Sequence, residues 1–184
     1  LIIKRSGRFF PIIEPILKEE GIPDDFKYLC VIESNLMTTA KSPAGAVGLW
    51  QILETTGKEL GLEVNKDIDE RYNIIKSTHA ACKFLKKAYE KFGSWTLVAA
   101  AYNGGQGRVS RNIATQKQNN FYDILWAEET SRYPFRIMAV KLIMENPKDY
   151  GFNISEKDFY KPYETYTVNV DTTINDLAQF AIDK

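Results

Sequence analysis

Before residue 160, apolar residues recur at helical spacing and no strand-like alternation interrupts them. Within each segment they fall at positions i, i+3, i+4 and i+7, which places them on one face of a helix. Glycine and proline separate the segments, as at Gly21 and Pro23. The pattern predicts about seven helices, over Phe9–Glu20, Phe26–Asn35, the second part of Leu49–Leu60, Ile74–Phe92, Trp95–Ala101, Arg108–Ala114 and Thr130–Asn146.

Local residue chemistry predicts where some of these helices begin. Asp24 or Asp25 is expected to cap the helix that ends near Asn35. Ser77 or Thr78 is expected to cap the long helix over Ile74–Phe92. Pro15 either kinks the first helix or marks its start. Between the second and third helices, residues 40–48 are mostly small and are expected to form a loop.

The pattern changes after Gly151. Residues 161–170 alternate in the manner of a strand, and Ile174, Leu177, Ala178 and Ala181 form a short amphipathic stretch behind them. We therefore expect an all-α domain over residues 1–154 and a C-terminal segment over 155–184 with some β character. That segment is either an arm packed back on the domain or the truncated start of a second module.

Composition narrows the class of protein. The 184 residues are 44% hydrophobic and 26% charged, which suits one folded domain. Lys and Arg together number 24, as do Asp and Glu, so there is no basic surface of the kind that binds nucleic acid. No apolar run is long enough to span a membrane. The chain opens at Leu1 without Met, so we expect any targeting segment to have been removed.

The rare residue types exclude several chemistries. Cys30 and Cys82 are the only cysteines and His79 is the only histidine, so neither a His/Cys zinc site nor a Ser-His-Asp triad is expected. Both cysteines lie in helical patterns and read as small buried hydrophobes, although a disulfide between them stays open. His79 reads as a surface or hydrogen-bonded polar residue.

Glu33 is the first candidate for chemistry. It shares a helix face with Phe26, Leu29 and Cys30, so its carboxyl is expected to lie against apolar groups. Such burial raises the pKa of a carboxyl and lets it act as a general acid near neutral pH. The alternative is a glutamate at a helix end that reaches water or pairs with a lysine.

Two further segments carry polar groups among small residues. In Gly45-Ala46-Val47-Gly48-Leu49-Trp50-Gln51, the glycines permit close approach of the backbone to a ligand or a neighbouring helix. In Ala100-Ala101-Tyr102-Asn103-Gly104-Gly105, a Tyr and an Asn lie at a helix end. Each segment alone is a weak signal, because Trp50 suits a core and Asn-Gly-Gly suits a helix stop.

Together, Glu-Ser, Gly-Leu-Trp-Gln and Ala-Tyr-Asn in this order resemble the signature of the lysozyme-like lytic transglycosylases of the soluble type. The resemblance runs from about Pro23 to Leu142 and is nearest to the membrane-bound murein transglycosylase D group, in which Trp is common at the position of Trp50. Further segments have counterparts at similar spacing, namely 42–46, 69–71, 77–81, 104–109 and 129–134.

The resemblance implies a helical fold around a cleft and cleavage of peptidoglycan glycan strands, without metal or organic cofactor. Glu33 matches the family's single acid/base. Ser42 matches a serine that hydrogen-bonds near the N-acetyl group of muramic acid. Gln51 and Tyr102 match residues that line the scissile site, and Asn103 completes the third motif. Glu129 and Tyr133 match a Glu and a Tyr that shape the cleft and hold the residues around the acid in place. It also implies the bacterial cell envelope, in the periplasm or anchored to the outer membrane. We expect a monomer, although no pattern fixes the oligomeric state.

Most glycosidases use two carboxyls, so Glu33 would ordinarily have a partner. Glu54 lies near a helix start, where acidic residues favour the helix dipole, and Glu129 reads equally well as a cleft residue or a surface residue. A single Glu suffices if the substrate's acetamido group assists and its O6 hydroxyl closes a 1,6-anhydro ring. The alternatives are a goose-type lysozyme-like hydrolase and a peptidoglycan-binding domain without activity.

Overall fold

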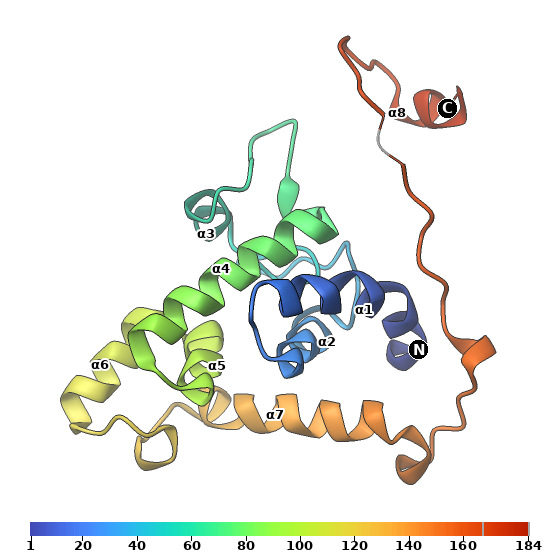
Figure 1. The fold of residues 1–184 in the computed structure, drawn as a ribbon. Helices are drawn as coiled ribbons and strands as arrows, with labels where there is room; N and C mark the ends of the chain where they lie inside the picture. The colour runs from blue at the N-terminus through green and yellow to red at the C-terminus, as the bar shows by residue number, and fades with distance from the viewer. Residues whose placement is uncertain (167, 184) are drawn as a thin grey trace.

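In the computed structural model, residues 1–166 and 168–183 are described, and they form helices joined by loops. Helix α5 (Trp95–Gly104) lies at the centre, in contact with α4 (Ile74–Phe92), α6 (Gln106–Gln116) and α7 (Glu128–Glu145). The residues from Leu97 to Ala101 are all buried, because a helix that is apolar on every side needs neighbours all round it. Figure 1 shows α7 running along one edge of the body beneath the other helices.

The N-terminal half packs around this centre. Helix α1 (Ile2–Glu19) packs on α4, and a 3₁₀ turn, η1 (Asp24–Lys27), leads into α2 (Tyr28–Ser34), which packs on α7. The short helix α3 (Glu54–Glu59) and a second turn, η2 (Glu70–Tyr72), flank the loop that follows α2. The all-α prediction is confirmed. The described residues contain no strand, only isolated β-bridges such as those from Lys41 to Val47 and from Val47 to Ile52.

Several predicted boundaries are wrong. Helix α1 begins at Ile2 rather than Phe9 and contains Pro15 in its interior; Ser6 is buried on its inner face and donates to the Ile3 carbonyl at 2.7 Å, which disguises the apolar period. Helix α5 continues past Ala101 to Gly104. These differences matter for the site, because Tyr102 and Asn103 are therefore held by helical backbone.

The predicted caps are also corrected. Asp24 and Asp25 lie inside η1, where Asp25 accepts a hydrogen bond from Lys141 at 2.7 Å. Helix α4 has the predicted ends, but its N-cap is Asn73, whose side chain accepts from the Lys76 amide at 3.0 Å. Ser77 and Thr78 are buried within the helix instead.

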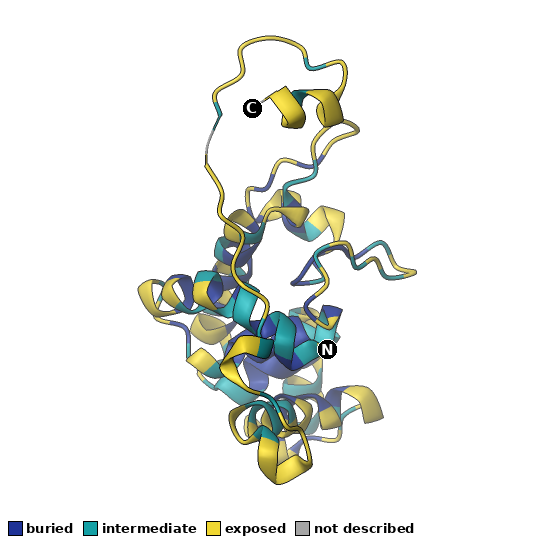
Figure 2. Ribbon diagram, turned by 90° about the vertical axis from the view of Figure 1, so that its right-hand side faces the viewer, coloured by how far each residue is buried: buried dark blue, intermediate teal, exposed yellow. Residues whose placement is uncertain are grey.

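The C-terminal segment lies beyond the turns η4 (Pro147–Tyr150) and η5 (Glu156–Asp158) and ends in α8 (Leu177–Asp183). Its first part contacts α1: the Tyr160 amide donates to the Lys4 carbonyl at 2.8 Å, and Arg8 donates to the Lys161 carbonyl at 3.0 Å. The rest leaves the helical body, and α8 lies apart from it (Figures 1 and 2).

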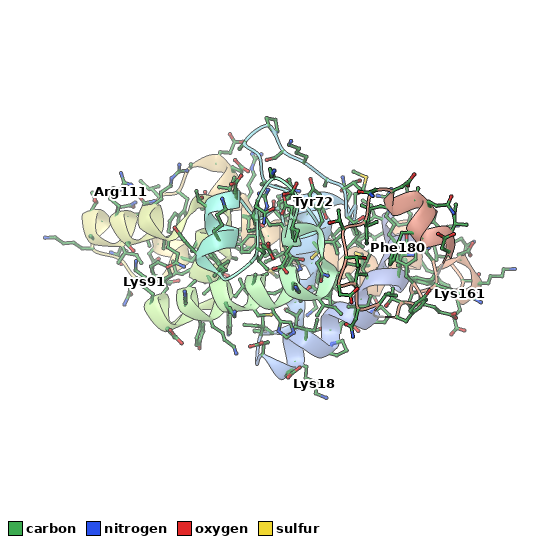
Figure 3. All side chains as sticks on the ribbon, turned by 90° about the horizontal axis from the view of Figure 1, so that it is seen from above. Lys18, Tyr72, Lys91, Arg111, Lys161 and Phe180 are labelled. Carbon is green, nitrogen blue, oxygen red and sulfur yellow. The ribbon has the colours of Figure 1, made fainter. Side chains whose placement is uncertain are left out.

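The strand expected over residues 161–170 does not form among the described ones, and Thr167 lies outside the described residues. An isolated extended segment has no partner to complete its backbone hydrogen bonds, so alternation alone does not make a strand. Seen from above, Lys91 and Arg111 lie toward one end of the molecule, and Lys161 and Phe180 toward the other (Figure 3).

Candidate functional site

The loop between α2 and α3 is closed by its own polar groups. The Ser42 amide donates to the Ala46 carbonyl at 2.9 Å, and the Ser42 hydroxyl accepts from the Ala46 amide at 3.0 Å. Val47 then bridges to Ile52, with hydrogen bonds of 3.2 Å in each direction. The loop is therefore a folded unit that presents the half-buried Ser42 at a defined position.

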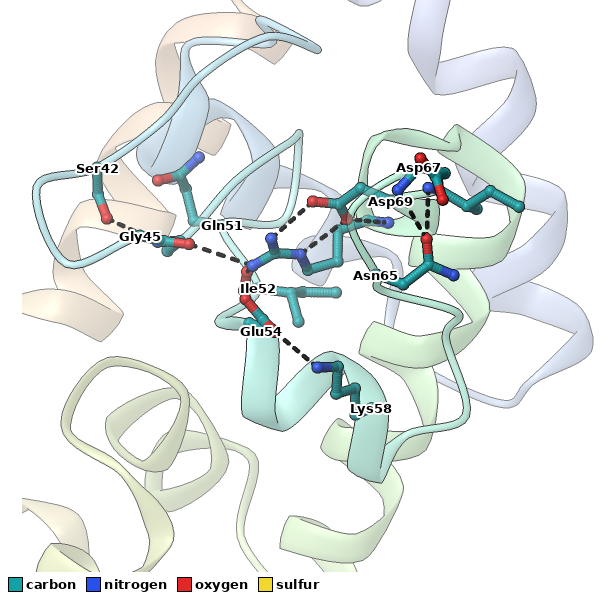
Figure 4. Close-up of polar contacts among 12 residues, drawn as sticks. Ser42, Gly45, Gln51, Ile52, Glu54, Lys58, Asn65, Asp67 and Asp69 are labelled. Atoms are coloured by element: carbon teal, nitrogen blue, oxygen red, sulfur yellow. Dashed lines mark hydrogen bonds and ion pairs between the residues drawn. The ribbon is translucent and has the colours of Figure 1, made fainter. Parts of the chain in front are cut away.

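Arg71 joins this loop to η2. Its side chain is 6% exposed and donates to the carbonyls of Gly45 at 3.2 Å and Ile52 at 3.1 Å. Two further bonds, of 2.9 and 2.6 Å, go to the Asp69 carboxylate. Figure 4 shows Gly45, Ile52 and Asp69 converging on this point. A paired guanidinium thus ties together the two sides of the loop that carries Ser42 and Gln51.

Gly48 makes this close approach possible. Its φ is +77°, a conformation that favours glycine, and a Cβ atom there would lie 2.4 Å from the Arg71 carbonyl oxygen. The sequence signal for the contact was present in the glycines of the loop, which indicated close approach without naming the partner. Arg71 itself was missed as a supporting residue.

Trp50 is a fully buried support for the site. Its indole Nε1 donates to the Thr78 hydroxyl at 2.9 Å, inside α4. The Tyr102 hydroxyl donates to the Trp50 carbonyl at 2.6 Å, and the Tyr102 ring meets Phe84 edge to face at 5.4 Å between centroids. These contacts link α4, α5 and the loop, and they explain why Trp50 belongs to the core rather than to an exposed stacking surface.

Gln51 adopts a left-handed backbone conformation, with φ +48°. Its amide nitrogen donates to the carbonyls of Ala40 at 3.1 Å and Gly48 at 3.0 Å. A primary amide has two N–H groups, so both are used, and the Oε1 oxygen is the atom of this side chain that can serve a ligand. Non-glycine residues with positive φ are uncommon and cluster at functional sites.

Glu33 lies half-buried near the end of α2, and the buried Tyr133 of α7 donates its hydroxyl to Glu33 Oε1. Burial raises the pKa of the Glu33 carboxyl, while the Tyr133 hydrogen bond and the charge of Arg136 oppose the rise and the charge of Glu129 adds to it. Burial is the largest of these effects. The carboxyl therefore keeps its proton to a higher pH than an exposed glutamate does.

The same burial acts on neighbouring groups. The pKa of Tyr102 and that of Tyr133 are both raised well above the ordinary tyrosine value, first by burial and then by the Glu33 charge. Both phenols therefore remain protonated hydrogen-bond donors. Cys30 and Cys82 are buried free thiols, as the hydrophobic reading predicted, and burial raises the pKa of Cys82 to about 12.

Asn103 connects the end of α5 to α7. Its amide nitrogen donates to Glu129 Oε1 at 3.1 Å, and its carbonyl oxygen accepts from the Thr130 hydroxyl at 2.9 Å. Glu129 is exposed, whereas Thr130 is buried. Thr130 is a second supporting residue that the sequence reasoning missed.

Two depressions flank this connection. One, of about 320 Å³, is lined by residues that include Gln51, Tyr102 and Asn103. The other, of about 330 Å³, is lined by Glu128, Glu129, Arg132 and Arg136. The hydrogen bond between Asn103 and Glu129 joins the two linings, and neither depression includes Glu33 or Ser42 among its lining residues.

The structure joins the predicted site residues in two hydrogen-bonded pairs, Glu33 with Tyr133 and Asn103 with Glu129. Gln51 and Tyr102 line the same depression as Asn103, the one of about 320 Å³. Glu54 is exposed and paired with Lys58 at 2.6 Å. His79 lies in another pocket and contacts Glu20 at 2.9 Å. In the described part of the chain, no cluster of three His, Cys, Asp or Glu side chains could hold a metal ion.

The packed helices, with a desolvated carboxyl at Glu33 and a cavity lined by Gln51, Tyr102 and Asn103, agree with the lysozyme-like fold that the resemblance implied. The family model described as the transglycosylase SLT domain matches residues 10–125. Over 147 residues the chain is 33% identical to the membrane-bound lytic murein transglycosylase D of Escherichia coli K12. The chain therefore belongs to the transglycosylase SLT domain family.

Solved structures share the fold. The soluble lytic transglycosylase Slt70 of Escherichia coli superimposes with a TM-score of 0.60 at 20% identity, over 84% of this chain and 27% of that one. An inactive mutant of the lytic transglycosylase Slt from Pseudomonas aeruginosa gives 0.60 at 19% identity, over 83% and 26%.

The match to transglycosylase D covers 77% of this chain but 32% of that protein, so the chain spans about a third of its relative. No helix among the described residues has the length and hydropathy to cross a membrane.

Proposed function

We propose that this domain is a peptidoglycan lytic transglycosylase. It cleaves the β-1,4 bond between N-acetylmuramic acid and N-acetylglucosamine and leaves a 1,6-anhydro end. The observation that carries the proposal is the half-buried Glu33 carboxyl, held by the hydroxyl of the buried Tyr133, in a protein of this family; its burial raises the pKa of that carboxyl. One relative is named as a membrane-bound lytic murein transglycosylase. That name supports peptidoglycan as the substrate and the bacterial cell envelope as the place of action.

In the proposed reaction, protonated Glu33 donates its proton to the glycosidic oxygen that leaves with N-acetylglucosamine. The oxygen of the muramic acid acetamido group attacks C1 as that bond breaks, giving a cyclic cation. The Glu33 carboxylate then takes the proton of the O6 hydroxyl, and O6 attacks C1 and displaces the acetamido oxygen. The proton returns to Glu33, and no water is consumed.

The other proposed site residues orient the sugars. Because both N–H groups of Gln51 bind the backbone, Gln51 would act as an acceptor, toward a substrate N–H or hydroxyl. Tyr133 would hold the Glu33 carboxyl in place. Ser42, Tyr102, Asn103 and Glu129 would shape the neighbouring surface, in which positioned polar groups favour the charge that develops in the transition state.

A second carboxyl would favour hydrolysis, as in a goose-type lysozyme-like enzyme. Glu54 is exposed and paired with Lys58. Glu129 acts on Glu33 through its charge and accepts a hydrogen bond from Asn103, so it is the one to test. If Glu129 only shapes the cleft, Glu129→Gln retains anhydro products at a lower rate.

The test is mass spectrometry of the products from purified peptidoglycan. The wild type should release muropeptides whose ends are lighter by one water than reducing ends, and Glu33→Gln should release none. Glu54→Gln is the matched control, since it removes a carboxyl outside the site. Reducing ends would identify a hydrolase, and full activity of Glu33→Gln would refute the role of Glu33. Binding without release by the wild type would leave a glycan-binding domain.

We also propose that residues 1–154 are the catalytic domain and 155–184 an arm leading away from it. Arg8 holds the first part of this arm on the domain, because it donates to the Tyr163 hydroxyl at 2.9 Å and its guanidinium lies 4.1 Å from that ring's centroid. Limited proteolysis should therefore cut after Tyr163 while activity persists. Loss of activity on cutting would make the arm part of the catalytic unit.

A further inference from the structure

The depression on α7 beside Glu129 contains one arginine that has no hydrogen-bond or ion-pair partner in the described chain. Arg132 pairs with Glu128 at 2.7 Å, and Glu129 accepts a hydrogen bond from Asn103. Arg136, exposed on the same lining, has neither a hydrogen bond nor an ion pair with any residue of the described chain. Its guanidinium therefore has all of its donors available to a ligand.

The position of Arg136 relates this charge to the proposed chemistry. Arg136 follows Tyr133 by three residues, which places the two on the same side of α7. Tyr133 donates to Glu33, and the charge of Arg136 lowers the pKa of that carboxyl. A ligand group held by Arg136 would thus lie close to the bond that Glu33 protonates.

The proposed substrate offers a matching anion. Each N-acetylmuramic acid carries a lactyl side arm. In strands without peptides the arm ends in a carboxylate, and in peptide-bearing strands it continues into a stem peptide that has carboxylates of its own. Arginine binds carboxylates with two parallel hydrogen bonds, and its charge persists at every pH of interest.

We propose that Arg136 is a substrate-binding residue that receives a carboxylate carried on the muramic acid side arm. This inference rests on the proposed function and extends it to a subsite for the side arm. Glu128 and Glu129 line the same depression, and their charges oppose the binding of an anion that Arg136 does not contact.

The test compares three variants on defined glycan strands. Arg136→Met removes the charge and keeps most of the side-chain length, and Arg136→Lys keeps the charge without the paired donors. Arg111→Met is the control, because it removes an exposed arginine of α6 that does not line this depression. Each is assayed on strands without peptides, on peptide-bearing strands, and on peptide-free strands whose lactyl carboxylate is methyl-esterified.

We expect Arg136→Met to raise KM about tenfold or more on an anionic substrate, because a hydrogen bond to a charged group is at stake. Arg136→Lys should recover part of the loss, and Arg111→Met should match the wild type. A loss confined to peptide-free strands identifies the lactyl carboxylate, and one confined to peptide-bearing strands identifies the stem peptide. Esterified strands should show no difference between Arg136→Met and the wild type.

Two results would overturn the subsite: an unchanged KM of Arg136→Met on both anionic substrates, or an equal rise on anionic and esterified strands. Either can occur while the wild type still produces anhydro ends, so failure of the subsite is separable from failure of the proposed function. Wild-type protein that cleaves no strand would refute the function itself.

Discussion

Removing the Tyr133 hydroxyl tests how the site sets the proton affinity of Glu33. This hydroxyl donates to Glu33 Oε1 and favours the ionised carboxyl, against the burial that favours the protonated one. Tyr133→Phe keeps the ring in the core and deletes the donor. The pKa of Glu33 should therefore rise, and the protonated acid that the reaction needs should persist to higher pH.

The size of the effect follows from the hydrogen bond. A bond to a charged group contributes about 1.5–3 kcal/mol and one to a neutral group about 0.5–1.5 kcal/mol. The difference of about 1–1.5 kcal/mol favours the ionised form, and about 1.36 kcal/mol corresponds to a tenfold change in proton affinity. The alkaline limb of the kcat/KM profile should thus move up by about one pH unit.

The assay is release of soluble muropeptides as a function of pH by the wild type and by Tyr133→Phe. Tyr122→Phe is the control, since Tyr122 is exposed and has no hydrogen bond through its hydroxyl among the described residues. An alkaline limb that stays in place, or that moves to lower pH, would show that Tyr133 does not favour the ionised Glu33.

Three further outcomes concern stability. Arg71→Met should cost about 3–5 kcal/mol in urea unfolding, because it leaves Asp69 and two loop carbonyls without their partner; Lys58→Met, at a surface pair, should cost under about 1 kcal/mol, and equal losses would contradict the role of Arg71. Gly48→Ala should cost about 1–3 kcal/mol, since its φ is +77° and the added Cβ would lie 2.4 Å from a carbonyl oxygen; an unchanged unfolding midpoint would refute the strain. Glu33 has an ordinary value of 4.5 and a raised folded pKa, so the unfolded chain releases the proton first and wild-type stability falls as pH rises from 4.5 through the folded pKa. Glu33→Gln should lack that fall in thermal unfolding, and parallel curves would contradict the burial of the charge.

The sequence predicted the helices well wherever apolar spacing decided them. Helix α4 has the predicted ends, because its apolar stripe stops at Gly93 and begins just after Asn73. The start of α1 was missed because Ser6 replaces an apolar residue on the buried face. Apolar periodicity indicates which face of a helix is buried. It does not reveal a small polar side chain that is buried on that face because it hydrogen-bonds to its own helix.

The candidate residues could be named from the sequence, but their contacts could not. Glu33 and Tyr133 are 100 positions apart, and no local pattern indicates that one donates to the other. A glutamine side chain can both donate and accept hydrogen bonds, yet the backbone occupies both donors of Gln51. Arg71 lies in the segment 69–71, to which the resemblance gave no role in the site. In each case the deciding interaction joins elements that only the packing of the helices brings together.

A single carboxyl that must give a proton and then take one back needs a proton affinity suited to both steps. Burial alone would make Glu33 a poor base, and exposure alone would make it a poor acid. Here burial raises its pKa while the Tyr133 hydroxyl and the Arg136 charge oppose the rise. An anion bound at Arg136 would weaken one of the two opposing effects, so the carboxyl should hold its proton more firmly when the side-arm subsite is filled. The subsite would then favour the protonated acid at the moment the substrate arrives.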